Sequence, residues 1–191
     1  MRIAPEEYQR IQLRAHSLLA AVPIHDVWAV DLPEDGANRT IVDVRSLLSK
    51  HGIHTASTTA KFLFGLRALL GRVFDWDRES REAFKESFLH RLSDADKQSS
   101  LVPPGTREGA FRVLFVSPRE AISEVRNATV HGFSVFALLP RASGYRLYWA
   151  IYVQPVGRIT ELYMHLIDPF RRLIIYPAVL RHIRAVWSRG E

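Results

Sequence analysis

The chain has 191 residues, of which 47% are hydrophobic and 24% are charged, and its formal net charge is +6. This length is enough for one substantial hydrophobic core, so we expect a single folded domain over residues 1–191. The sequence contains no cysteine. Structural disulfides, thiolate zinc sites, iron–sulfur clusters and cysteine nucleophiles are therefore excluded.

The positive charge does not point to a nucleic-acid partner. Basic residues are dispersed among apolar ones, and no zinc-finger or RNA-recognition motif is present. Charged residues recur through the segment from Met1 to Val22, which argues against a signal peptide. No charge-free apolar run reaches the roughly 20 residues of a transmembrane helix. We therefore expect a cytoplasmic protein without a transmembrane segment.

The N-terminal half is expected to contain two or three helices and one strand. Pro5 and the acidic residues after it favour the start of a helix within residues 1–22. Alternation over residues 25–32 predicts a strand. Thr40 can cap a further helix that ends before Gly52, and apolar residues at helical spacing predict another helix over residues 59–76.

The pattern then changes to a period of two. Residues 77–105 are more polar and are expected to form a variable surface segment, with a turn or helix cap at residues 93–96. Short turns join the segments that follow and leave no room for parallel crossovers, so an antiparallel meander is expected. Its predicted strands are residues 110–116, 121–126, 129–139, 145–153 and 158–167.

A long helix is predicted for the C-terminus, over residues 168–187. Asp168 can cap it, and Pro177 should kink or restart it near Tyr176. The apolar residues expected to face the sheet are Phe170, Leu173, Ile174, Leu180, Ile183 and Trp187. The predicted fold is α+β, with a curved antiparallel sheet around this helix, an arrangement that favours an apolar cavity between them.

Two stretches of the chain carry a family resemblance. Residues 124–131, read Glu-Val-Arg-Asn-Ala-Thr-Val-His, and residues 162–177, with Pro-Phe-Arg-Arg and Tyr-Pro, resemble a bacterial domain-of-unknown-function family numbered 2867. More broadly, the chain resembles the helix-grip superfamily SRPBCC, which includes START domains, polyketide cyclases and birch-pollen-allergen-like proteins. The likeness runs from His25 onward and implies a cavity but no assigned activity. The family pattern has lysine at Asp168, so a contact made by that lysine is absent here.

The first candidate site is a polar row at Asn127, Thr129 and His131. Residues two apart share one face of a strand, so an amide, a hydroxyl and an imidazole would line up to hold a carbonyl and move a proton. The alternative is a solvent face, or a histidine satisfied by backbone partners.

A second row, Glu161, Tyr163 and His165, would lie on one face of the last predicted strand. It could form another acid–base set, or it could simply face water. Histidines on neighbouring strands could approach a metal, but the pattern does not favour one, and no metal or cofactor is predicted.

Aromatic residues and one arginine complete the candidate ligand-binding set. Tyr148 and Tyr152 share one strand face and Trp149 lies on the other, and periodicity does not decide which face is inside. Arg171 and Arg172 suggest either an anionic ligand group or a salt bridge to a nearby carboxylate, and the salt bridge is favoured. The pair His25 and Asp26 suggests no function.

These observations lead to two function hypotheses. The first is a domain that binds a small hydrophobic or amphipathic molecule and either only binds it or converts it without a redox cofactor, as a cyclase, dehydratase or isomerase does. His131 is then the candidate acid–base, with Asn127 and Tyr163 orienting a carbonyl. The second is an interaction module that uses the basic C-terminal helix at a membrane surface or protein partner. The sequence determines neither the ligand nor the oligomeric state, for which a homodimer is one alternative.

Overall fold

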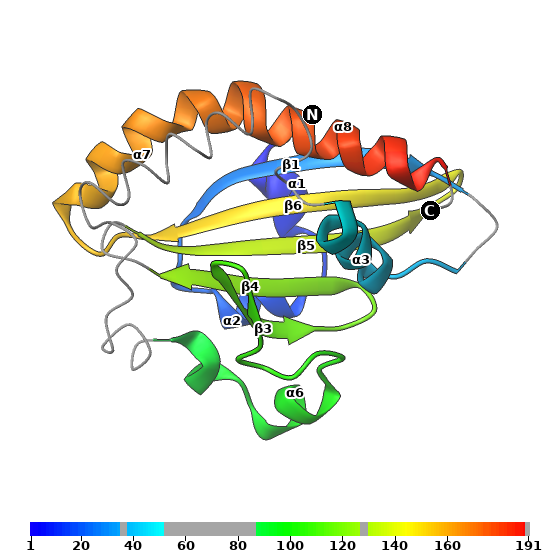
Figure 1. Cartoon of the computed structure of the whole chain (residues 1–191). Helices are drawn as coiled ribbons and strands as arrows, with labels where there is room; N and C mark the ends of the chain where they lie inside the picture. The colour runs from blue at the N-terminus through cyan, green and yellow to red at the C-terminus, as the bar shows by residue number, and fades with distance from the viewer. Residues whose placement is uncertain (35–37, 52–86, 127–129, 190–191) are drawn as a thin grey trace.

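A computed structural model describes residues 1–34, 38–51, 87–126 and 130–189 of the chain. In this part of the chain a six-stranded antiparallel sheet has the strand order β1-β6-β5-β4-β3-β2. Figure 1 shows that the sheet is curved. The strands are β1 (Ile24–Pro33), β2 (Arg107–Glu108), β3 (Phe111–Val116), β4 (Glu120–Arg126), β5 (His131–Arg141) and β6 (Gly144–Gln154).

The longest hairpin of the sheet joins β5 to β6 and depends on a glycine. Gly144 has a φ of +127°, and a Cβ atom there would lie 2.3 Å from the carbonyl oxygen of Leu32. No other residue fits both the backbone conformation and this close approach. Gly144 therefore lets β1 lie beside the turn, where Pro33 pairs with it.

A long C-terminal helix crosses one face of the sheet (Figure 1). It consists of α7 (Arg158–Phe170), a π-helical turn (Arg171–Ile175) and α8 (Tyr176–Trp187). The predicted α+β fold, with a curved antiparallel sheet and a long C-terminal helix, is confirmed. The predicted irregularity near Tyr176 is also confirmed, because α8 begins there with Pro177 in its first turn, where a missing N–H is tolerated.

The predicted strand over residues 158–167 is wrong, because this segment belongs to α7. Leu162, Met164 and Leu166 alternate as in a strand, but leucine and methionine are strong helix formers. The four-residue spacing of buried Thr160 and Met164 also matches a helix. A short apolar run fits both periods, and here helix propensity and packing on the sheet favoured the helix.

The C-terminal helix begins at Arg158, ten residues before its predicted start, and two further expectations are therefore wrong. Asp168 does not cap a helix; it lies inside α7 and its carboxylate contacts His25. Phe170 and Leu173 do not pack on the sheet, since 45% and 77% of these residues are exposed. The π-helical turn changes the residue spacing, so an apolar stripe drawn with one uniform period does not continue through it.

The N-terminal half contributes short helices, and part of it lies outside the described residues. Residues 1–22 form two short helices, α1 (Pro5–Gln9) and α2 (Arg14–Leu18), where one helix was expected. The predicted helix after Thr40 is α3 (Ile41–His51). The helix predicted over residues 59–76 falls outside the described part.

The described part of the polar segment contains the 3₁₀ helix η2 (Phe88–Arg91) and α6 (Asp94–Ser99). The predicted cap at residues 93–96 is confirmed, because Ser93 and Asp96 form a capping box. The segment also reaches the interior, since Phe88 and Leu92 are buried.

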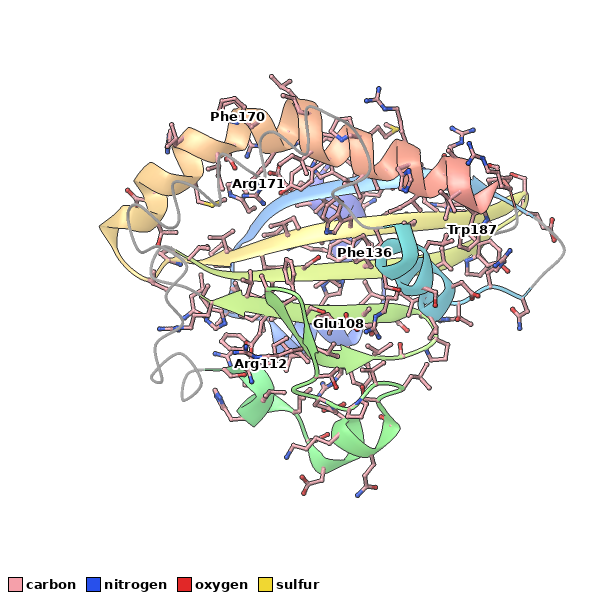
Figure 2. All side chains as sticks on the ribbon, in the orientation of Figure 1. Glu108, Arg112, Phe136, Phe170, Arg171 and Trp187 are labelled. Carbon is pink, nitrogen blue, oxygen red and sulfur yellow. The ribbon has the colours of Figure 1, made fainter. Side chains whose placement is uncertain are left out.

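Both faces of the sheet are buried, each under its own hydrophobic core. On the face under α8 and α3, Trp28 and Trp149 of the sheet pack with Leu180 of α8, and Figure 2 labels Phe136 and Trp187 in this region. On the opposite face, Phe133, Tyr148 and Tyr152 of the sheet pack with Tyr8 of α1 and Phe88 of η2. Successive side chains of β6 therefore point alternately into two different hydrophobic cores, and neither face of this strand is exposed to solvent.

Leu180 gives a direct test of how firmly α8 is anchored. Its side chain is 3% exposed within the core under α8. We expect Leu180→Ala to lower the free energy of unfolding by about 2–5 kcal/mol, because a cavity replaces lost apolar contacts. Leu166→Ala on α7, where the leucine is 53% exposed, should change it by less than about 1 kcal/mol. Chemical denaturation measures both, and equal effects would show that α8 is peripheral.

Candidate functional site

A groove of about 650 Å³ lies between α7 and the start of β1, within the size range of small-molecule sites. Apolar residues make up much of its wall, including Ile24, Val153, Met164 and Pro169. The polar residues that line it are Glu161, His165, His25, Asp168, Arg172 and Thr160. Two predicted ligand-binding residues, Glu161 and His165, therefore belong to one groove, but from a helix and not from a strand.

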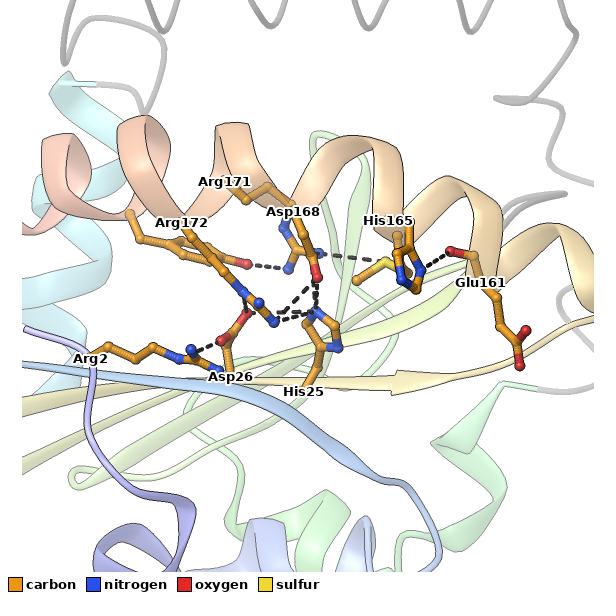
Figure 3. A network of polar contacts seen from close by, with 10 residues as sticks. Arg2, His25, Asp26, Glu161, His165, Asp168, Arg171 and Arg172 are labelled. Atoms are coloured by element: carbon orange, nitrogen blue, oxygen red, sulfur yellow. Dashed lines mark hydrogen bonds and ion pairs between the residues drawn. The ribbon is translucent and has the colours of Figure 1, made fainter.

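A network of ion pairs, drawn in Figure 3, includes three residues that line this groove, His25, Asp168 and Arg172. Asp26 lies at its centre and is only 1% exposed. Arg172 Nε lies 3.1 Å from one carboxylate oxygen of Asp26, and Arg2 Nε lies 3.0 Å from the other. A buried carboxylate needs such partners, so the network ties α7 to the outer strand of the sheet.

His25 and Asp168 form the part of the network that lines the groove. The Nε2 atom of His25 lies 2.9 Å and 2.8 Å from the two carboxylate oxygens of Asp168. Because a carboxylate only accepts hydrogen bonds, Nε2 carries the proton and donates. The other ring nitrogen, Nδ1, points away from the network in Figure 3. Among the described residues, no hydrogen-bond partner of Nδ1 is found.

Two arginines of the π-helical turn complete the network. Burial lowers the pKa of Arg172, but its contacts with Asp26 and Asp168 outweigh this, so the pKa is raised and the guanidinium stays charged. Arg171 lies 3.4 Å from Asp168 and donates to the hydroxyl of Tyr176. The preference for a salt bridge at these arginines is confirmed. The π-helical turn is therefore what directs both side chains toward the carboxylates.

The imidazole of His25 and the carboxylates of Asp26 and Asp168 are also a possible metal-ligand set. Their donor atoms lie within 4.8 Å of one another. However, Arg172 contacts both carboxylates, and Arg2 contacts Asp26 as well. A divalent cation would have to displace or repel these guanidinium groups, so the surroundings fit an ion-paired histidine better than a metal.

A smaller groove, of about 530 Å³, lies next to the first and is lined by His16, Tyr152 and residues 19–24. The hydroxyl of Tyr152 lies 3.4 Å from His16 Nδ1, and burial raises the pKa of Tyr152 to about 12. Tyr152 was predicted to bind a ligand. Tyr8 is fully buried, and its ring packs on those of His16 and Tyr152.

His131, the predicted acid–base residue, lies in the core under α1 and α2. It is 1% exposed, its ring packs between Phe88 and Phe133, and Nε2 lies 3.1 Å from Glu124. Glu124 also accepts hydrogen bonds from the hydroxyl of Ser87 and the backbone N–H of Phe88. His131 lines neither groove. Its role in catalysis stays a prediction.

The other predicted site residues are dispersed. Asn127 and Thr129 fall outside the described residues, and Tyr163 belongs to α7 with its side chain outside the described part. Trp149 packs under α8, where its indole N–H donates to Ser134. Tyr148 lies on the opposite face and accepts a hydrogen bond from Arg141.

Sequence reasoning missed His25 and Asp26, which it treated as a pair without function. Their signal was available in part, because a carboxylate within a strand of apolar residues needs a buried partner. What the sequence could not supply was that Asp168 and Arg172, more than 140 positions away, lie on a helix beside that strand.

The match to known proteins covers the whole sheet and every residue of this network except Arg2. Residues 18–178 match a family described as a protein of unknown function, DUF2867. The chain belongs to this DUF2867 family. A comparison with curated proteins and one with solved structures both found no match. Family membership thus confirms the resemblance to the numbered family. The family description assigns no function, so the groove of this DUF2867 protein is the basis for a functional proposal.

Proposed function

We propose that this DUF2867 protein binds a small amphipathic molecule in the groove between α7 and the start of β1. The observation that carries the proposal is the combination, in one groove, of apolar lining residues with the ion-paired residues His25, Asp168 and Arg172. An apolar body would bury against Met164 and Val153, and a polar group would meet the ion-paired residues. A cytoplasmic location and membership of the SRPBCC superfamily fit this proposal, the latter through the curved sheet and long C-terminal helix.

Binding can be tested with 1-anilinonaphthalene-8-sulfonate, an amphipathic dye that fluoresces in apolar sites. Leu173 lines the groove and is 77% exposed, so Leu173→Asn should weaken dye binding without loss of stability. Met164→Trp should fill the groove and raise the dissociation constant at least about tenfold, equivalent to about 1.4 kcal/mol. Fluorescence titration measures both variants.

Leu166→Asn is the matched control, because Leu166 is an exposed leucine of the same helix that does not line the groove. It should bind the dye as the unmodified protein does. Equal affinity in all four proteins would reject the groove as the binding site. Native mass spectrometry of the purified protein would then identify any molecule that remains bound.

A second candidate function, docking to a protein or membrane surface, has one observation in its favour. Leu166, Phe170 and Leu173 are exposed along α7 and the π-helical turn, and Arg181 and Arg184 are exposed on α8. Among the described residues, no helix is both long enough and apolar enough to cross a membrane. Sedimentation with vesicles of phosphatidylglycerol and phosphatidylcholine tests surface binding, which Leu166→Asn should weaken while leaving dye binding intact.

A further inference from the structure

His25 combines three features that the binding proposal does not use. It lines the groove, its Nε2 atom is held by both oxygens of Asp168, and its Nδ1 atom points away from the network. A carboxylate that holds one ring nitrogen fixes the tautomer, so the lone pair lies on the other nitrogen. The groove is therefore lined by a histidine whose proton-accepting nitrogen is oriented by Asp168.

We propose that the groove is a catalytic site, an inference that rests on the proposed function. In this site His25 accepts a proton from a carbon atom next to the carbonyl group of a bound amphipathic molecule. Asp168 is a positioning residue that acts through His25. Arg172 holds the far side of this pair, with Nη2 3.2 Å from Asp168 and 3.4 Å from His25 Nε2.

The proposed step needs no metal, redox partner or other reactant. The C–H bond beside the carbonyl breaks, its proton forms a new N–H bond at Nδ1, and its electron pair forms a C=C bond. The carbonyl oxygen thereby becomes an enolate oxygen. Return of the proton to the same carbon regenerates the substrate, and return to a different carbon of a conjugated substrate gives an isomer. The reaction class is thus proton abstraction and isomerisation.

The charged groups around His25 come from four parts of the chain. Asp26 on β1 lies 3.6 Å from Nε2, Asp168 and Arg172 approach from α7 and the π-helical turn, and Arg2 approaches Asp26 from the N-terminus. Glu161 and His165 line the same groove. Arg171, 3.4 Å from Asp168, belongs to the same network, so three guanidinium groups face the two carboxylates around the imidazole.

The experiment uses 2-decanone, which joins an apolar chain to a carbonyl with exchangeable C–H groups. In D₂O, proton NMR follows the loss of the C1 and C3 signals as deuterium replaces hydrogen. We expect the full-length protein to accelerate this exchange above the rate in buffer. His25→Gln should remove at least about 99% of the acceleration, the size of a general-base contribution.

Two controls separate catalysis from general damage. His90→Gln replaces a histidine of η2 outside the groove and should leave the exchange rate unchanged. Asp168→Asn should reduce the acceleration at least about tenfold and alter its pH profile, whereas Asp168→Glu should restore part of it. A purely structural role for Asp168 would change thermal stability but leave the pH profile of the remaining activity intact.

Binding of 2-decanone is measured on the same samples by saturation-transfer NMR, so the two proposals can fail separately. No acceleration above buffer, or the same acceleration in His25→Gln, overturns the catalytic proposal. If 2-decanone binds and Met164→Trp abolishes binding, the binding proposal survives that result. If acceleration is lost on adding a chelator, a metal and not the imidazole drives the exchange, which also overturns the catalytic proposal.

Discussion

Replacing Glu124 by alanine is expected to lower the free energy of unfolding by about 3–5 kcal/mol, among the largest effects of any single change in this protein. The carboxylate is 4% exposed and accepts hydrogen bonds from three donors on two other elements. Without it, the imidazole of His131, the hydroxyl of Ser87 and the backbone N–H of Phe88 lose a buried partner. Each unsatisfied buried group costs about 1–3 kcal/mol, partly relieved by relaxation.

Glu124 also predicts how stability responds to acid. Burial raises the pKa of this carboxyl, but hydrogen bonds from His131, Ser87 and Phe88 outweigh it, so the pKa lies below its usual value of 4.5. A lowered folded-state pKa adds stability at a pH above the unfolded-state value, and this contribution is lost as the pH falls through the folded-state pKa. Glu124→Gln should therefore show a weaker loss of stability below about pH 4.5.

Urea denaturation at pH 7 and at several lower values measures both effects. Glu161→Ala, which removes an exposed carboxylate on α7, is the matched control and should change the free energy of unfolding by no more than about 0.5 kcal/mol. If Glu124→Ala has an effect as small as this control, the carboxylate does not hold η2 to the sheet. His131→Ala is a companion test. If His131 has a structural role as the partner of Glu124, this variant should also lower the free energy of unfolding.

Replacing Trp187 by alanine is expected to cost about 3–5 kcal/mol of stability. Trp187 is the largest fully buried side chain at the end of α8, with 1% exposure. Its indole N–H donates to the carbonyl oxygen of Pro33 at 3.0 Å, and its ring meets Tyr145 edge-on and lies beneath the guanidinium of Arg39. The change would remove the contact that joins the C-terminal helix to the end of β1.

Trp187→Phe separates packing from hydrogen bonding at this position. It keeps an aromatic ring but leaves the carbonyl oxygen of Pro33 without its donor, so a loss of about 1–2 kcal/mol is expected. Thermal denaturation followed by circular dichroism measures both variants. An effect below about 1 kcal/mol for Trp187→Ala would mean that the end of α8 is frayed in solution, contrary to its burial.

The boundary between sheet and helix in the C-terminal third shows how far local pattern can be trusted. Residues 145–153 alternate with many β-branched and aromatic side chains, and they form β6 as predicted. Residues 158–167 alternate too, but their leucines and methionine fit a helix equally well, and they form α7. The choice depended on which partner surface could bury them, and this information is not local.

The candidate site shows the same limit. Glu161 and His165 were predicted to bind a ligand from a strand. They do line the groove, but from the helix α7. His25, Asp168 and Arg172 were not predicted as a set. The contact of Asp168 with His25 depends on the placement of α7 beside the start of β1. The contact of Arg172 with Asp26 is made from the π-helical turn.

By itself, the sequence determined the α+β class, most of the strands, the position of the irregularity before Pro177 and the absence of cysteine chemistry. These properties depend on periodicity, proline geometry and composition, which act over a few residues. The tertiary structure alone decided that both faces of β6 are buried, that His131 pairs with Glu124, and that His25 meets Asp168. Each of these depends on the free energy of burying polar or apolar surface against a segment far away in the sequence. Local sequence patterns do not show which segment that is.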